Sequence, residues 1–135
     1  MSGPGVSAPP ARLLLDTHVF LWWTDGSHGR LSRAARDAIG ASPATFVSYA
    51  TAWEVAVKTA TAKLRLDVPF TYALEINSFA ALPISLDHVE RVAAMPLHHR
   101  DPFDRMLVAQ AQHEGLLLVT HDATLGRYDV PVLWA

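Results

Sequence analysis

LLLDTHVFLWW, residues 13–23, is the stretch that decides the fold. The run Arg12–Leu15 is short and apolar, which predicts a buried strand, and helical spacing follows over His18–Trp23. Asp16 and Thr17 lie between the two. A strand that leads directly into a helix is the repeating unit of α/β domains, so we expect this fold class.

The same alternation continues along the rest of the chain. Turn and capping residues such as Ser32, Asp101 and Gly115 separate the further elements. We expect strands at 45–48, 82–85, 116–120 and 130–133, helices at 32–39, 49–62, 70–80, 87–94 and 102–114, and a short turn or helix at 122–127. Strands alternating with helices over short loops predict a mostly parallel sheet with helices on both faces.

Composition bounds the possibilities. The chain has 135 residues, half of them apolar and 18% charged, which fits one compact domain that we place at residues 12–135. Without cysteine there is no disulfide scaffold, thiol nucleophile or thiolate zinc site, and a cytoplasmic protein is expected.

Residues 1–11 are small, proline-rich and uncharged, so we expect a flexible tail and not a secretory signal. The apolar runs are far shorter than the roughly 20 residues of a membrane span. A net charge of −2 argues against a protein that coats nucleic acid through a large basic surface.

Four acids are expected at one edge of the sheet. Asp16 follows the first strand and Asp122 the strand at 116–120, while Glu54 and Asp104 lie one turn into helices that adjoin strands. Open α/β sheets bind ligands beyond the carboxyl ends of their strands. Crowded carboxylates repel one another unless a cation neutralises them, and oxygen ligands without cysteine suit Mg²⁺ or Mn²⁺. Such an ion activates water for attack on a phosphodiester, so the pattern indicates hydrolytic phosphoryl chemistry.

Each acid also has a purely structural interpretation. Asp16 and Asp122 suit helix caps, and Asp104 occupies a position where an acid supports the cap formed by Asp101. Glu54 precedes Lys58 by four residues, as in a surface ion pair. The combination of the four, and not any single acid, favours a functional site.

The chain resembles the PIN-domain family, and within it the VapC-type toxin ribonucleases, from Leu13 to Trp134. Four motifs carry the resemblance in order: LLLDTH at 13–18, SYATAWE at 48–54, HHRDPFDR at 98–105 and VTHD at 119–122. The family implies a three-layer domain with strand order 3-2-1-4-5, which places the first and fourth strands side by side.

The resemblance also implies the activity and the partners. It implies a metal-dependent endoribonuclease that dimerises and is neutralised by a small VapB-like antitoxin. Residue by residue, the implied metal and catalytic set is Asp16, Glu54, Asp104 and Asp122, with Asp101 as a less certain fifth acid. For RNA contact we expect Thr17, Lys58 and Arg105, with Arg100 and Lys63 as further candidates.

Other interpretations stay open or are disfavoured. A catalytically silent PIN-like module that binds RNA or a partner is the main alternative, and a nuclease that acts on DNA or processes RNA more broadly is another. Zinc is disfavoured because the seven histidines show no HxxxH or HExxH spacing. An aspartyl-phosphate phosphatase would need a second Asp two residues after Asp16, where His18 stands. Trp22, Trp23 and Trp53 lie on apolar helical stretches, so we expect them to pack in the core and not to stack on bases.

Overall fold

The structure is a computed structural model that describes residues 11–135, so the expected flexible tail lies, apart from Ala11, outside the described residues. The sheet has five strands in the order β3-β2-β1-β4-β5, and all four pairings are parallel. The strands are β1 (Leu13–Leu15), β2 (Thr45–Ser48), β3 (Ala80–Leu82), β4 (Leu117–Thr120) and β5 (Val132–Trp134). The expected α/β class and the strand order 3-2-1-4-5 are confirmed, and the sheet is parallel throughout.

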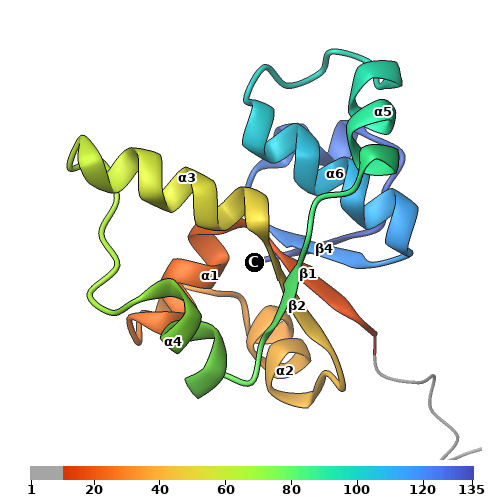
Figure 1. The fold of residues 1–135 in the computed structure, drawn as a ribbon. Helices are drawn as coiled ribbons and strands as arrows, with labels where there is room; N and C mark the ends of the chain where they lie inside the picture. The colour runs from red at the N-terminus through yellow and green to blue at the C-terminus, as the bar shows by residue number, and fades with distance from the viewer. Residues whose placement is uncertain (1–10) are drawn as a thin grey trace, which may run out of the picture.

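Helices join the strands and cover both faces of the sheet (Figure 1). They are α1 (Thr17–Thr24), α2 (Arg33–Ala41), α3 (Tyr49–Ala60), α4 (Phe70–Ile76), α5 (Leu86–Ala94) and α6 (Pro102–Glu114), with short 3₁₀ helices η1 (His28–Arg30) and η2 (Ala123–Arg127). Helical crossovers are the usual connection between parallel strands. Within the described residues, no helix is long and apolar enough to cross a membrane.

The residues of β1 divide the core in two. Leu13 and Leu15 face a cluster that includes side chains of α1, α2 and α4, whereas Leu14 faces a cluster built by α6, β4 and η2. All three leucines are fully buried. This alternation follows from the two-residue period of a strand, and it explains why a continuous apolar run is required when helices cover both faces.

Several boundaries differ from the expected ones for local reasons. The helix expected at 70–80 ends at Ile76, because Asn77 donates a hydrogen bond from its amide to the carbonyl of Ala73 at 2.8 Å and Ser78 takes a left-handed φ of 56°. The third strand is Ala80–Leu82 and not 82–85, since Pro83 has no N–H to continue the ladder.

Other elements shift by one or two residues. The first helix begins at Thr17, directly after its cap, and the second runs through Gly40 to Ala41. The last strand is Val132–Trp134 and not 130–133, because Val130 is held in a turn by a hydrogen bond from its N–H to the carbonyl of Tyr128 at 2.9 Å.

The prediction for the tryptophans is correct for two and wrong for one. Trp22 and Trp23 are partly buried and pack against the core. Trp53 is 63% exposed and stands edge-on to the ring of Phe103, with 5.2 Å between ring centroids. The reason is that α3 buries Ala50 toward one cluster and Val55 toward the other, which leaves the face of Trp53 outward.

Two glycines allow a matched test of backbone conformation. Gly115 ends α6 with a left-handed φ of 68°, whereas Gly40 lies inside α2 and an added Cβ would meet nothing within 4 Å. We expect Gly115→Ala to lower the free energy of unfolding by about 1 kcal/mol and Gly40→Ala to raise it by about 0.5 kcal/mol. Urea denaturation measures both, and equal effects would contradict the assigned helix end.

Candidate active site

Asp16 joins the ends of the two central strands. It follows β1 and caps α1, because the N–H of Val19 donates to its Oδ1 at 2.9 Å. The hydroxyl of Thr120, the last residue of β4, donates to its Oδ2. Asp16 is only 6% exposed, and this burial raises its pKa above the usual range in spite of the two hydrogen bonds. A buried carboxylate with a raised pKa favours a nearby cation.

Glu54 lies on α3, the helix that follows β2, and is 3% exposed. The hydroxyl of Thr17 donates to its Oε1, and the ammonium of Lys58 is bonded to its Oε2. The hydrogen bond to Glu54 raises the pKa of Lys58. The ion pair expected between Glu54 and Lys58 is therefore present, but Glu54 is buried and not on the surface.

Two acids open α6. Asp101 is the cap, with its Oδ1 accepting from the N–H groups of Phe103 and Asp104 at 2.8 and 3.1 Å. Burial, followed by repulsion from Asp101, Glu54 and Asp16, raises the pKa of Asp104 to about 7. Asp104 therefore carries an unbalanced charge when it is ionised at neutral pH.

Asp122 comes two residues after β4 and caps η2, with the N–H of Thr124 at 2.9 Å from its Oδ1. Its Oδ2 lies 2.8 Å from Nε2 of His99. Partial burial alone would raise the pKa of Asp122, but the hydrogen bonds from His99 and Thr124 outweigh it and hold the pKa below its usual range. Asp122 thus stays ionised to a lower pH than an ordinary aspartate does.

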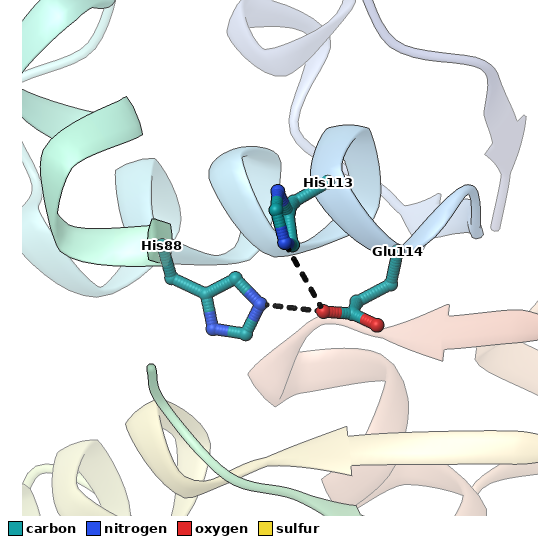
Figure 2. A group of neighbouring side chains, drawn as sticks. All are labelled: His88, His113 and Glu114. Carbon is teal, nitrogen blue, oxygen red and sulfur yellow. Dashed lines mark hydrogen bonds and ion pairs between the residues drawn. The ribbon is translucent and has the colours of Figure 1, made fainter. Parts of the chain in front are cut away.

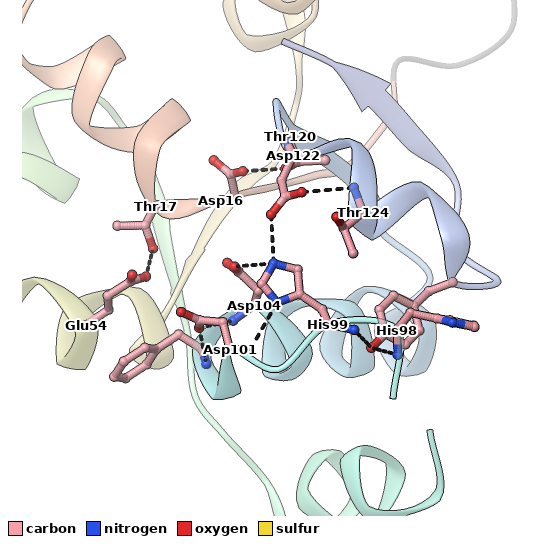
Figure 3. A network of polar contacts seen from close by, with 12 residues as sticks. Asp16, Thr17, Glu54, His98, His99, Asp101, Asp104, Thr120, Asp122 and Thr124 are labelled. Carbon is pink, nitrogen blue, oxygen red and sulfur yellow. Dashed lines mark hydrogen bonds and ion pairs between the residues drawn. The ribbon is translucent and has the colours of Figure 1, made fainter. Parts of the chain in front are cut away.

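The fold brings all the predicted acids to one edge of the sheet. Figure 3 shows the carboxyl groups of Asp16, Glu54, Asp101, Asp104 and Asp122 around one region, reached from β1, α3, α6 and the segment after β4. Their structural interpretations hold as well, since three of the five are caps. The donor set is made of hard oxygens and the pKa values of Asp16 and Asp104 are raised, so the residues present fit a divalent cation such as Mg²⁺ or Mn²⁺.

The residues expected to contact RNA are placed differently from one another. Thr17 is buried and Lys58 half-buried, and both hold Glu54. Arg105 turns toward the end of α5 and donates to the carbonyls of Val92 and Met95 at 3.2 and 3.1 Å. Their role in binding RNA stays a prediction.

The two further basic candidates are exposed. Arg100 lines a depression of about 350 Å³ together with His98, His99 and Thr124, directly beside the acids. Lys63 lies beyond the end of α3. Of the two, Arg100 is the one that the structure places at the candidate site.

Sequence reasoning missed two side chains at this site, His99 and Thr120. Nε2 of His99 lies 2.8 Å from Asp122 and 3.3 Å from Asp104, and Thr120 holds Asp16. The sequence signal was present in part, because His99 falls within the quoted motif at 98–105 and Thr120 within that at 119–122. The contacts themselves depend on how the irregular segment before α6 folds, which no periodicity reports.

Comparisons with known proteins agree with this fold. The family model described as the PIN domain matches residues 13–131. Among solved structures, the chain is similar to a toxin–antitoxin complex from Klebsiella pneumoniae, with 23% identity, a TM-score of 0.62, and coverage of 90% of this chain and 95% of that chain. It is also similar to VapBC2 from Rickettsia felis bound to a DNA fragment from their promoter, with 12% identity, a TM-score of 0.63, and coverage of 90% and 97%. DNA-bound VapBC from Salmonella typhimurium is similar at 13% identity and a TM-score of 0.61, with coverage of 92% and 98%. No protein of curated function matches the sequence.

The crowding of charge at Asp104 has a measurable effect on stability. Its folded pKa of about 7 lies above the unfolded value of 3.8, so the folded protein binds more protons and loses stability as pH rises from about 4 to 7. In EDTA, Asp104→Asn should raise the free energy of unfolding by about 1–3 kcal/mol at pH 8 and change it little near pH 4. Thermal melts at the two pH values measure the difference.

Asp122→Asn is the matched control with the opposite sign. The lowered pKa of Asp122 means that its ionised form stabilises the fold above about pH 4. This variant should lower the melting temperature at pH 8, and the difference should shrink as pH falls below about 4. A stabilised Asp122→Asn or a destabilised Asp104→Asn at pH 8 would contradict the charge distribution described here.

Proposed function

Because the chain belongs to the PIN-domain family, we propose that it is a metal-dependent endoribonuclease that hydrolyses RNA phosphodiester bonds and acts as the toxin of a toxin–antitoxin pair. The observation that carries the proposal is the gathering of Asp16, Glu54, Asp104 and Asp122 at the carboxyl edge of one parallel sheet. A purely structural role for these acids explains the caps. It does not explain why the pKa values of Asp16 and Asp104 are left raised.

Mg²⁺ or Mn²⁺ would be held by Asp16, Glu54, Asp104 and Asp122. When bound, such a cation supplies a water of lowered pKa and stabilises the charge that develops on the phosphate. The chain's own contribution is orientation: Thr120 and Val19 hold the carboxylate of Asp16, and Thr17 and Lys58 hold that of Glu54.

Asp104 should make the affinity of this site for a cation depend on pH. A cation favours the ionised carboxylate, so a carboxyl with a pKa of about 7 must release its proton when the cation binds. Affinity for the cation should therefore rise between pH 6 and pH 8.

Arg100 is the cation on the chain that we favour for contact with the RNA backbone. It is exposed in the depression beside Asp122 and Asp104, where a phosphate would approach the acids. Lys58 is the second candidate, because 29% of its side chain stays exposed while it holds Glu54. Arg105 is engaged with the end of α5, so we do not assign it a phosphate.

The partner part of the proposal rests on similarity of fold. The similar structures are described as a toxin–antitoxin complex and as VapBC bound to DNA. We infer a cytoplasmic toxin of the VapC type that forms a homodimer and is neutralised by a VapB-like antitoxin. A catalytically silent module that binds RNA or a partner is the alternative, as is a nuclease that accepts DNA.

The first test is cleavage of total cellular RNA by the purified protein. We expect cleavage with Mg²⁺ or Mn²⁺, none with EDTA, and a loss of about 100-fold or more in Asp16→Asn and Asp104→Asn, because each variant removes a charged ligand. Asparagine caps a helix as well as aspartate does, so Asp16→Asn keeps the cap of α1, and Asp104→Asn removes only a carboxylate whose charge destabilises the fold. Asp37→Asn, on the exposed surface of α2, is the control that should keep full activity.

The alternatives give different results in the same assay. Equal cleavage of single-stranded DNA would move the assignment to a general nuclease, because only contacts to the 2′-hydroxyl separate the two substrates. Binding of RNA without cleavage, by folded protein with Mg²⁺ bound, would support the silent module and contradict the enzyme.

Toxicity is a separate prediction. Expression of the wild-type chain in a bacterial host should arrest growth, and Asp16→Asn should remove the arrest at equal protein level because the site loses a ligand. Colony counts after induction measure the effect. Arrest that persists in Asp16→Asn would show that toxicity does not come from the acidic site.

A further inference from the structure

Two groups of side chains in the described part of the chain place histidine nitrogens and carboxylate oxygens within 4.8 Å of one another. One consists of His99, Asp104 and Asp122 at the candidate active site (Figure 3). The other consists of His88, His113 and Glu114, where α5 packs on α6 (Figure 2). Either group has the composition of a metal site. A ring nitrogen that carries a proton cannot bind a metal, so the position of the proton on each histidine decides whether that histidine is a ligand.

The ring of His99 is held in one tautomer. Its Nδ1 accepts a hydrogen bond from the backbone N–H of Asp101 at 3.0 Å. A backbone amide always carries its hydrogen, so this Nδ1 is bare, and the single proton of a neutral imidazole must lie on Nε2. Nε2 faces Oδ2 of Asp122 at 2.8 Å and Oδ2 of Asp104 at 3.3 Å. His99 therefore donates to Asp122, lies in ion-pair contact with Asp104, and has no free lone pair for a metal.

The loop that carries His99 is fixed from the other side. The backbone N–H groups of His98 and His99 both donate to the hydroxyl of Tyr128, at 3.1 and 2.9 Å. Tyr128 is only 5% exposed and belongs to the core cluster under α6. The ring of His99 is thus anchored at its backbone and at Nδ1, which leaves Nε2 in a set position between the two acids.

We propose that His99 is a positioning residue that holds Asp104 and Asp122 in place for the cation through its Nε2–H and does not bind the cation itself. This inference rests on the proposed function, because it concerns the same acids. The Nε2–H offsets part of the repulsion between the two carboxylates, because it fixes the direction of one oxygen of Asp122 and faces one oxygen of Asp104. Residues that orient metal ligands in this way commonly change metal affinity by 10- to 100-fold when removed.

His88 provides an internal comparison. Its Nδ1 accepts the backbone N–H of Ser85 at 3.0 Å, and its Nε2 lies 2.8 Å from Oε2 of Glu114. The same reasoning places its proton on Nε2, so this group is a hydrogen-bonded link between α5 and α6 and not a metal site. Ten residues of α6 separate Glu114 from Asp104, which is about 15 Å along the helix. Mg²⁺ at the acids should leave His88 unchanged.

The first experiment reads the proton positions directly. Long-range ¹H–¹⁵N correlation spectra of the labelled full chain assign the tautomer of each ring in EDTA and in Mg²⁺. We expect His99 to carry its proton on Nε2 in both conditions, as His88 does. A proton on Nδ1 of His99, or loss of the Nε2 proton on addition of Mg²⁺, would overturn the proposal because either result makes Nε2 a ligand.

The second experiment measures Mg²⁺ affinity by calorimetry in matched variants. His99→Ala should bind Mg²⁺ about tenfold more weakly, whereas His99→Gln, which keeps an N–H donor near the same place, should stay within about threefold of the wild type. His98→Ala, whose ring contacts Tyr128 and not the acids, should bind normally. Equal affinity in His99→Ala and wild type would contradict the positioning role.

These results separate the proposal from the proposed function. Intact Mg²⁺ affinity and tautomer without RNA cleavage would leave the role of His99 supported and the ribonuclease contradicted. Cleavage and Mg²⁺ binding that are both unchanged in His99→Ala would support the ribonuclease and contradict the positioning role of His99. His99→Gln accompanies His99→Ala as the control for folding, because it keeps an N–H donor near the same place.

Discussion

The site depends on the parallel pairing of β1 with β2 on one side and β4 on the other. Parallel strands end at the same edge of a sheet, so residues that follow them are brought together whatever their separation in sequence. Asp16 and Thr120 are 104 positions apart and share a hydrogen bond for this reason alone. The helices also bring acids to this edge. The helix α3 starts directly after β2, and α6 starts at this edge and runs back, so that β4 can be parallel to β1.

The same arrangement moderates the repulsion that it creates. Asp16, Asp101 and Asp122 each accept hydrogen bonds from backbone N–H groups at the start of α1, α6 and η2. The first turn of a helix carries partial positive charge, which favours carboxylates there. Glu54 has a lysine instead, through Lys58. These contacts do not compensate Asp16, whose pKa is raised by burial, or Asp104, whose pKa is raised by burial and by repulsion from the other acids.

Much of the fold followed from the sequence because two-residue and helical periods are local properties. The gathering of the acids also followed, because parallel strands end at one edge of the sheet and Asp16 and Asp122 each come just after a strand. The edges of β3 and β5 did not, because Pro83 and the turn at Val130 act through single backbone hydrogen bonds. Trp53 was misjudged because α3 shares its apolar residues between two core clusters, which a pattern on one helix does not reveal. His99 was missed because its contacts come from an irregular segment.

The capping acids have two roles, and this affects how such a chain can evolve. At Asp16, Asp101 and Asp122 the side chain serves both the fold and the charge of the site. Asparagine satisfies the first requirement and fails the second. A single-base substitution from aspartate to asparagine would therefore remove charge from this edge of the sheet and still leave a helix cap in place.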